Sequence, residues 1–199
     1  SVGIKPEWVE MVKDLAADKV KVDYFTVDVA LSYNANILPV LRQIKRSYPD
    51  AYVIVGNGCT EEWASWLLST RLCNCIKVGI GVSKACQTRQ FTGFGSSTIS
   101  SVEDCSKSVE KWNHYKRPDT KFSLMSDGGI TVNKDGIPFI GDITKALVVG
   151  KADWVMSGAL FKHCSDSPSV TDGYFGNASA HGKGHDKHIE GRKMTVHSN

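Results

Sequence analysis

Short apolar segments alternate with amphipathic segments along most of this chain, and this order constrains the fold more than any other feature. The apolar segments read as buried parallel strands: YFTVDVA (24–30), AYVIVG (51–56), IKVGI (76–80), FSLMSDG (122–128) and WVMSG (154–158). The amphipathic segments carry apolar residues at helical spacing, over residues 6–17, 34–47, 61–70, 99–113 and 141–149. A repeated strand-then-helix order predicts an α/β protein with a parallel sheet.

Polar residues and glycines gather where these strands end, at Asp28, Asn57, 79–81, 127–129 and 157–158. The carboxyl ends of parallel strands meet at one edge of a sheet, and that edge carries the ligand in most α/β proteins. Taken singly, a glycine at a strand end fits a tight turn, and Asp28 or Asn57 fits a helix cap. Their recurrence at successive strand ends favours a binding site.

The number of strands predicts an incomplete (β/α)8 TIM barrel, with about five to six of the eight βα units present. Residues 1–3 fit the tail of a sixth strand. We expect residues 1–199 to form the C-terminal part of a single barrel domain whose first units lie in a longer chain. An edge completed by a partner and a sheet that closes differently are the alternatives. Segment 130–142 predicts a hairpin around residues 134–136, and residues 165–199 predict a mobile flap.

The composition argues against several function classes. A formal charge of +3 with scattered lysines and arginines does not indicate a nucleic-acid surface. No run approaches the ~18 apolar residues of a membrane span, and residues 1–5 lack the pattern of a signal peptide, which favours a cytoplasmic protein without a membrane contact. The six cysteines form no CxxC pair, so we expect reduced thiols of which at most one is chemically special.

Cys86 is the cysteine with the most suggestive surroundings. It stands on a glycine-containing loop directly after a predicted strand, with Lys84, Thr88 and Arg89 close in sequence. Such a setting exposes and activates a thiol. A lone cysteine is nevertheless more often a plain loop residue, and the neighbouring motif has to decide between the two interpretations.

That motif, IKVGIGVSKACQTRQFTGFG, resembles the active-site loop of the GMP reductase and IMP dehydrogenase family. Further segments resemble the same family in the same order: FTVDVA, VIVGN, LMSDGGI, GDITKAL, VMSGALF, YFGNAS and KHIEGRK. The pairing of TR with TGFG favours the GMP reductase branch, as does the absence of an inserted domain within these residues. The resemblance covers nearly the whole chain.

The resemblance implies a catalytic and a substrate-binding set. Cys86 would attack C2 of the purine, Thr88 would move protons at the leaving amine, and Asp127 would hold the ribose hydroxyls. The backbone N–H groups that it assigns to the phosphate belong to Gly128, Gly129, Ser157 and Gly158. The flap residues that it places over the base, where a plain surface loop is the alternative, are Tyr174, Gly176 and Ser179.

The resemblance also implies the cofactors and partners. NADPH would supply a hydride for the reductive deamination of GMP to IMP and ammonia, with Asp28 and Asn57 on the cofactor side. A monovalent cation, K⁺, would be held by backbone carbonyls around Gly81, Ser83 and Cys86. The partners would be the purine nucleoside monophosphates GMP and IMP, and the full-length protein would be a homotetramer.

Three departures from the family pattern leave other functions open. Ser83 replaces a glycine, residues 30–32 differ beside the cofactor side, and Ala180 replaces a glutamate that relays protons to the departing amine. The alternatives are an NAD-dependent IMP dehydrogenase and a catalytically impaired nucleotide-binding protein. A structural fragment without a ligand is a third, which would require the glycine pattern to be incidental.

Overall fold

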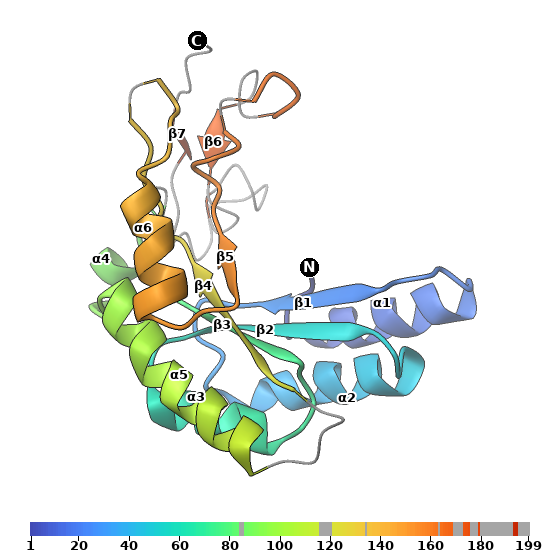
Figure 1. Cartoon of the computed structure of the whole chain (residues 1–199). Helices are drawn as coiled ribbons and strands as arrows, with labels where there is room; N and C mark the ends of the chain where they lie inside the picture. Colours follow the sequence, from blue (N-terminus) through green and yellow to red (C-terminus); the bar gives the residue numbers. More distant parts are fainter. Residues whose placement is uncertain are drawn as a thin grey trace.

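A five-stranded parallel sheet in the order β1-β2-β3-β4-β5 forms the centre of the molecule (Figure 1). The computed structural model describes residues 1–83, 86–115, 121–133, 135–162, 164–168, 173–175, 179 and 193–194. The strands are β1 (Tyr24–Asp28), β2 (Tyr52–Gly58), β3 (Cys75–Val78), β4 (Ser123–Asp127) and β5 (Trp154–Met156). Each pairs in parallel with its sequence neighbour, as in a segment of a (β/α)8 barrel. The predicted α/β fold with five parallel strands is therefore confirmed.

The helices follow the strands in the predicted alternation. They are α1 (Pro6–Ala17), α2 (Leu38–Ser47) after the 3₁₀ turn η1 (Ala35–Ile37), α3 (Glu61–Ser69), α4 (Thr88–Thr92), α5 (Thr98–His114) and α6 (Ile140–Thr144), which continues into the π-helical turn η2 (Lys145–Val149). All five predicted helices are present. The extra helix, α4, is too short to leave a periodic pattern in the sequence. Within the described residues, no helix combines the length and apolar character needed to cross a membrane.

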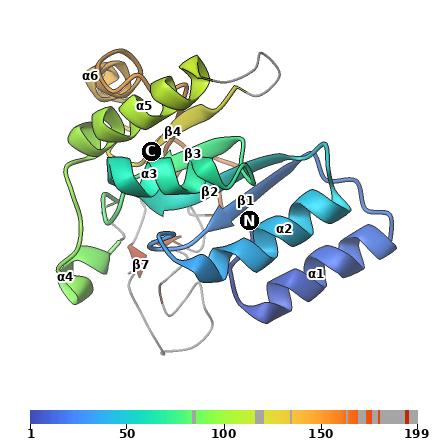
Figure 2. The ribbon, with the colours of Figure 1, turned by 90° about the horizontal axis from the view of Figure 1, so that it is seen from below.

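The core lies on one face of the sheet. Alternate strand residues such as Val27, Val53 and Leu124 are fully buried, and they pack against buried side chains of α1, α2, α3 and α5. Figures 1 and 2 show these four helices gathered on one side of the strands. On the opposite face, Tyr24 is 70% exposed and Trp154 is 54% exposed. A barrel segment has this asymmetry because its second face points to the barrel interior.

Both irregular features expected near the sheet are present. Val2 forms a parallel bridge with Val27, where Val2 N donates to Thr26 O at 2.8 Å, so residues 1–3 do lie along the edge of β1. Segment 130–142 contains an antiparallel bridge between Val132 and Pro138, which confirms the predicted hairpin.

A small antiparallel pair within residues 165–199 was not predicted. It joins β6 (Tyr174–Phe175) to β7 (Lys193–Met194). Strands of two residues carry too little pattern to be read from sequence. Most of the remaining flap range lies outside the described residues.

Candidate functional site

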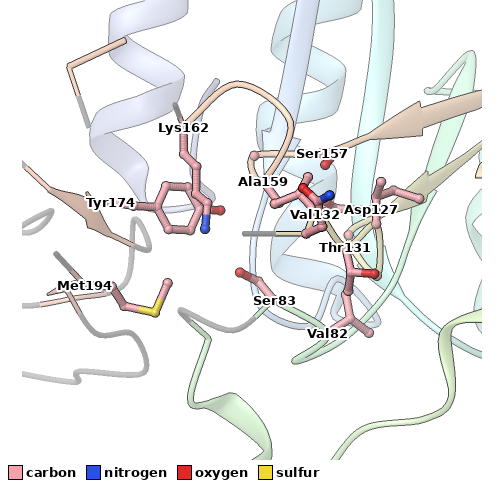
Figure 3. A pocket seen from close by; sticks show the side chains of 15 residues that line it. Val82, Ser83, Asp127, Thr131, Val132, Ser157, Ala159, Lys162, Tyr174 and Met194 are labelled. Atoms are coloured by element: carbon pink, nitrogen blue, oxygen red, sulfur yellow. The ribbon is translucent and has the colours of Figure 1, made fainter. Parts of the chain in front are cut away.

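Two adjoining cavities lie at the carboxyl ends of the strands. The first, which we call the cysteine cavity, has a volume of about 540 Å³. Its lining residues are Asp28, Val29, Ala30, Asn57, residues 79–83, Cys86, Thr88, Asp127, Gly128, residues 156–158, Tyr174 and Phe175. The second, the glycine cavity, has a volume of about 450 Å³ (Figure 3). Its lining residues are Val82, Ser83, residues 127–133, Ser157, Gly158, Ala159, Lys162, Tyr174 and Met194. The two cavities adjoin, because they share lining residues: Val82, Ser83, Asp127, Gly128, Ser157, Gly158 and Tyr174. Volumes of this size suit small organic ligands.

Cys86 and Thr88 meet at the wall of the cysteine cavity. The Cys86 N–H donates to Ser83 O at 3.0 Å, and the Cys86 thiol donates to Thr88 Oγ1 at 3.2 Å. Cys86 is half-buried, whereas Thr88 begins α4 and is buried. A thiol that opens into a cavity beside a hydroxyl can act as a nucleophile with a proton-transfer partner.

Arg89 ties this loop to the chain on its other side. Its Nε donates to Ile80 O at 3.0 Å, and its guanidinium also donates to Ser96 O. A Cβ on Gly81 would lie 2.5 Å from Arg89 Cγ, and one on Gly95 would lie 2.5 Å from Arg89 Nε. Glycine at both positions therefore allows the Arg89 side chain to lie between the two backbone segments. From the sequence, Arg89 was a neighbour of Cys86 and part of the TR pairing, and these contacts with Ile80 and Ser96 were not predicted.

Lys77 is the residue that the sequence analysis missed most clearly. It lies within β3, is 1% exposed, and its Nζ is 3.0 Å from Asp28 Oδ1 and 2.5 Å from Asp127 Oδ2. Nζ also donates to Asn57 Oδ1. Burial lowers the pKa of Lys77, but the Asp127 and Asp28 carboxylates outweigh it and hold the pKa above its ordinary value. The signal was present in the sequence, because a lysine in the apolar run IKVGI requires buried partners.

Lys77 joins the predicted substrate side to the predicted cofactor side. Asn57 Nδ2 donates to Asp127 Oδ2 at 2.9 Å and also to Gly79 O. Neither Asp28 nor Asn57 caps a helix, since Asn34 caps η1 and Thr60 caps α3. Helix capping as the alternative role for Asp28 and Asn57 is therefore wrong.

Ser32, one of the residues that depart from the family pattern, donates two hydrogen bonds to the backbone of Asn57. It is fully buried, its hydroxyl donates to Asn57 O at 3.0 Å, and Trp63 Nε1 donates to the same hydroxyl at 2.8 Å. The Ser32 N–H donates to Asn57 O at 2.7 Å. Ser32 therefore links Trp63 to the backbone of Asn57, a residue that lines the cysteine cavity.

The glycine turns after β4 and β5 shape the glycine cavity. Gly128 and Gly129 have φ values of +80° and +74°, which side chains rarely tolerate. The Gly128 N–H donates to Met156 O at 2.9 Å, so this one of the four N–H groups assigned to a phosphate is already bonded within the sheet. Any Cβ on Gly158 would collide with Tyr174 Oη, which therefore lies directly over this glycine.

The cysteine loop tests the predicted cation site only in part. Ser83 is not among the described residues with positive φ, so its replacement of glycine costs no left-handed strain. The Ser83 carbonyl already accepts the Cys86 N–H, although a carbonyl oxygen can accept a second partner. Residues 84 and 85 lie outside the described residues. Cation binding by Gly81, Ser83 and Cys86 remains a prediction.

The structure brings most predicted site residues together. Those that line the cysteine cavity are Asp28, Asn57, Gly81, Ser83, Cys86, Thr88, Asp127, Gly128, Ser157, Gly158 and Tyr174. Gly129 lines the glycine cavity, and Ser179 is 2% exposed and lines neither cavity. Gly176 and Ala180 lie outside the described residues.

Comparison with known proteins places these features in a family. The family model described as the IMP dehydrogenase / GMP reductase domain matches residues 1–188. Similar proteins named GMP reductase occur in Staphylococcus carnosus, Oceanobacillus iheyensis and Bacillus subtilis, each 35% identical over 206 residues. These matches cover 98% of this chain and 57% of each relative, so the chain spans little more than half the length of those proteins. The chain belongs to the IMP dehydrogenase / GMP reductase family.

Proposed function

We propose that the protein is an oxidoreductase that converts GMP to IMP and ammonia with NADPH as the reductant. The observation that carries this proposal is the half-buried Cys86 thiol, which contacts Thr88 and opens into the same pair of cavities as Asp127 and the glycine turns. The similarity to proteins named GMP reductase supports the choice of substrate.

The covalent chemistry begins at Cys86. The sulfur adds to C2 of guanine and forms a C–S bond, and the C2–N bond then breaks so that the amine leaves as ammonia. The departing nitrogen takes up a proton, for which Thr88 Oγ1, 3.2 Å from the Cys86 sulfur, would be the relay. A bound NADPH would supply the hydride that C2 requires. Cys86 would then leave C2 as the C–S bond breaks, which releases IMP, and would take up a proton to become a thiol again.

Asp127 orients the nucleotide in this proposal. Lys77 and Asn57 both contact its Oδ2 atom, which leaves Oδ1 to accept hydrogen bonds from the ribose hydroxyls. Asp127 lines both cavities, so a ribose held there would place the base on the Cys86 side and the phosphate on the glycine side. Asp28 and Asn57 line the cysteine cavity alone, which suits the cofactor side.

Full activity would require the complete barrel. We infer that residues 1–199 form part of a single (β/α)8 domain, with residues 165–199 as a flap over the base, and that the whole protein is a homotetramer which uses K⁺ at the cysteine loop. The uncovered sheet face with its exposed Tyr24 and Trp154 supports a barrel interior that further strands complete.

The test is GMP-dependent oxidation of NADPH by the whole protein, combined with mass analysis for a purine bound to Cys86. We expect turnover with GMP, a covalent adduct in the wild type, and neither in Cys86→Ser. Cys164→Ser is the matched control, because Cys164 is an exposed cysteine that lines neither cavity. Oxidation of IMP with NAD⁺ in place of GMP reduction would reject the proposal.

A further inference from the structure

The short helix α4 carries Thr88 beside Cys86, but it has little packing of its own. Thr88 is the one buried residue among its five, and Phe91 is 64% exposed. Figure 2 shows α4 outside the row of helices that covers the sheet. So short a helix is not stable by itself, because most of the stability of protein helices comes from a packed face. Contacts outside the helix therefore have to keep α4 in place.

Arg89, the residue after Thr88, makes contacts of this kind with both ends of the loop. Its Nε donates to Ile80 O at 3.0 Å, and its guanidinium donates to Ser96 O. Ile80 is buried just after β3, and Ser96 comes directly before the N-cap residue of α5. Arg89 thus fixes α4 to one segment that the sheet anchors and to a second that α5 anchors.

Two glycines leave the space that the Arg89 side chain occupies. A Cβ on either Gly81 or Gly95 would come within 2.5 Å of an Arg89 side-chain atom. Gly81 has a φ of +67°, which by itself favours glycine, whereas Gly95 is not among the described glycines with positive φ. The contact with Arg89 is therefore the reason for glycine at position 95, and an alanine there would displace the Arg89 side chain.

We propose that Arg89 is a positioning residue for the reaction: it fixes α4 so that Thr88 Oγ1 stays within hydrogen-bond distance of the Cys86 thiol. This inference rests on the proposed function, in which Cys86 adds to C2 and Thr88 relays a proton. Arg89 lines neither cavity, so it acts through Thr88 and not on a ligand. Displacement of a reacting group by about 1 Å can lower a rate by about 10²-fold, whereas binding of the nucleotide needs no contact with Arg89.

The experiment compares Arg89→Ala with the wild type in the whole protein. We expect Arg89→Ala to lower kcat for GMP-dependent NADPH oxidation by about 10- to 100-fold and to change KM for GMP by less than about threefold. Added methylguanidinium should restore part of kcat, because it can donate to the same two carbonyl groups. Hydrogen exchange of the α4 amides should be faster in Arg89→Ala, and exchange of the strand amides should not change.

Gly95→Ala tests the same contact while Arg89 stays in the sequence. It should also lower kcat, and in the Arg89→Ala background it should add less than about twofold to the loss, because the side chain that it displaces is then absent. Arg42→Ala is the matched control, because Arg42 is an exposed residue of α2 that lines neither cavity, and it should behave as the wild type.

Three results would overturn the role of Arg89. They are a kcat for Arg89→Ala within about twofold of that for Arg42→Ala, losses from Gly95→Ala and Arg89→Ala that simply multiply, and a loss that KM shares and methylguanidinium does not restore. Failure of the proposed function has a different signature. If the wild type does not turn over GMP but α4 exchanges faster in Arg89→Ala, GMP reduction is rejected and the role of Arg89 in holding Thr88 beside Cys86 stands.

Discussion

Cys75 opens strand β3 and Cys86 lies on the loop after the same strand, yet the two thiols have opposite surroundings. Cys75 is fully buried, and burial raises its pKa to about 12. Cys86 is half-buried, lines a cavity and bonds to Thr88 Oγ1. A thiol that stays protonated and covered is inert, whereas one that reaches a cavity beside a hydroxyl can react. The difference shows that the start of β3 contributes to packing, whereas the loop after β3 carries a residue that can react.

The charged groups of β3 follow the same division. Lys77 lies on the same face of the strand as Cys75, two residues closer to the loop, and it contacts Asp28 and Asp127 from the ends of β1 and β4. One buried ammonium group thus holds two carboxylates, one on each side of the proposed reaction site. At the start of the strand, Cys75 is packed in a buried position. At its end, Lys77 keeps the Asp28 and Asp127 carboxylates close together by charge, because two carboxylates would otherwise repel each other.

The largest expected effect separates the two cysteines by function. Cys86→Ser should lower GMP-dependent NADPH oxidation by at least about 10³-fold, because a serine hydroxyl is a far weaker nucleophile, and should leave the free energy of unfolding nearly unchanged. Cys75→Ser should do the reverse: turnover stays within a few-fold, and the free energy of unfolding falls by about 1–3 kcal/mol because a hydroxyl is buried where a thiol packed. Steady-state kinetics and urea unfolding of both variants measure this.

A Cys86→Ser variant that keeps wild-type turnover would remove the nucleophile from the proposed mechanism. If instead Cys75→Ser lost turnover at unchanged stability, the comparison between the two ends of β3 would be reversed.

Removal of the Lys77 charge is expected to have the second largest effect. Lys77→Met leaves two carboxylates close together without their cation, and the free energy of unfolding should fall by about 3 kcal/mol, at the lower end for a buried pair because both carboxylates are partly exposed. The pKa of Lys77 is raised in the folded state, so its contribution is fully present below pH 10.5 and is lost only as the pH rises through the raised value. Urea unfolding from pH 7 to 11 should therefore show a constant difference that shrinks only at the alkaline end.

Two variants sharpen the Lys77 test. The double variant Lys77→Met with Asp28→Asn should regain part of the lost stability, because it removes one of the two uncompensated charges. Lys107→Met is the control, since Lys107 forms an exposed pair with Asp104 and should leave unfolding unchanged. A loss in Lys77→Met that is no larger than that in Lys107→Met would contradict the charge network.

Much of the scaffold follows from local patterns, and the parts that do not follow depend on contacts between distant segments. Periodicity locates all five strands and the five longer helices, and the turn residues within segment 130–142 indicate its hairpin. The role of Lys77 could not be assigned from its own segment, because its partners are Asp28 and Asp127, which only the parallel register brings to the same edge. The pairing of β6 with β7 is similarly non-local.

The candidate site was predictable to a similar extent. Glycines and polar residues at strand ends pointed to the edge of the sheet at which the two cavities lie, since parallel strands place those ends together. The sequence could not show that the Gly128 N–H is bonded to Met156 O, or that Ser32 supports Asn57, because both bonds join segments far apart in the chain. The Arg89 contacts with Ile80 and Ser96 depend in the same way on the path of the loop.

A smaller effect is expected at alkaline pH, where the free energy of unfolding should depend on the buried Cys75 thiol at the start of β3. Burial, followed by nearby Cys73 and Asp153, raises the pKa of Cys75 from 9.0 to about 12. The unfolded chain therefore releases this proton first, and the free energy of unfolding should fall as the pH rises from 9 toward 12. Cys75→Ala should flatten this decline, and Cys164→Ala, which alters an exposed cysteine, should not. Identical pH profiles for Cys75→Ala and the wild type would show that Cys75 is not protected as described.

The smallest expected effect concerns the support beneath Asn57. Ser32→Ala removes the hydroxyl that donates to Asn57 O and accepts the Trp63 indole N–H, and it leaves that indole N–H buried without its acceptor. We expect a loss of about 1–2 kcal/mol in the free energy of unfolding, because an unsatisfied buried donor costs more than the bond itself contributes.

The Ser32 N–H still donates to Asn57 O, so Asn57 should keep its place beside Lys77, and the affinity for GMP should change by less than about threefold. Ser69→Ala is the control, since Ser69 makes a comparable bond to Trp66 O on an exposed helix surface. Urea unfolding and GMP calorimetry on the same samples measure both quantities. If Ser32→Ala instead lowered GMP affinity by much more than threefold, the carboxyl end of the sheet would depend on its packing as well as on its charges, and the division between the two ends of β3 would not hold.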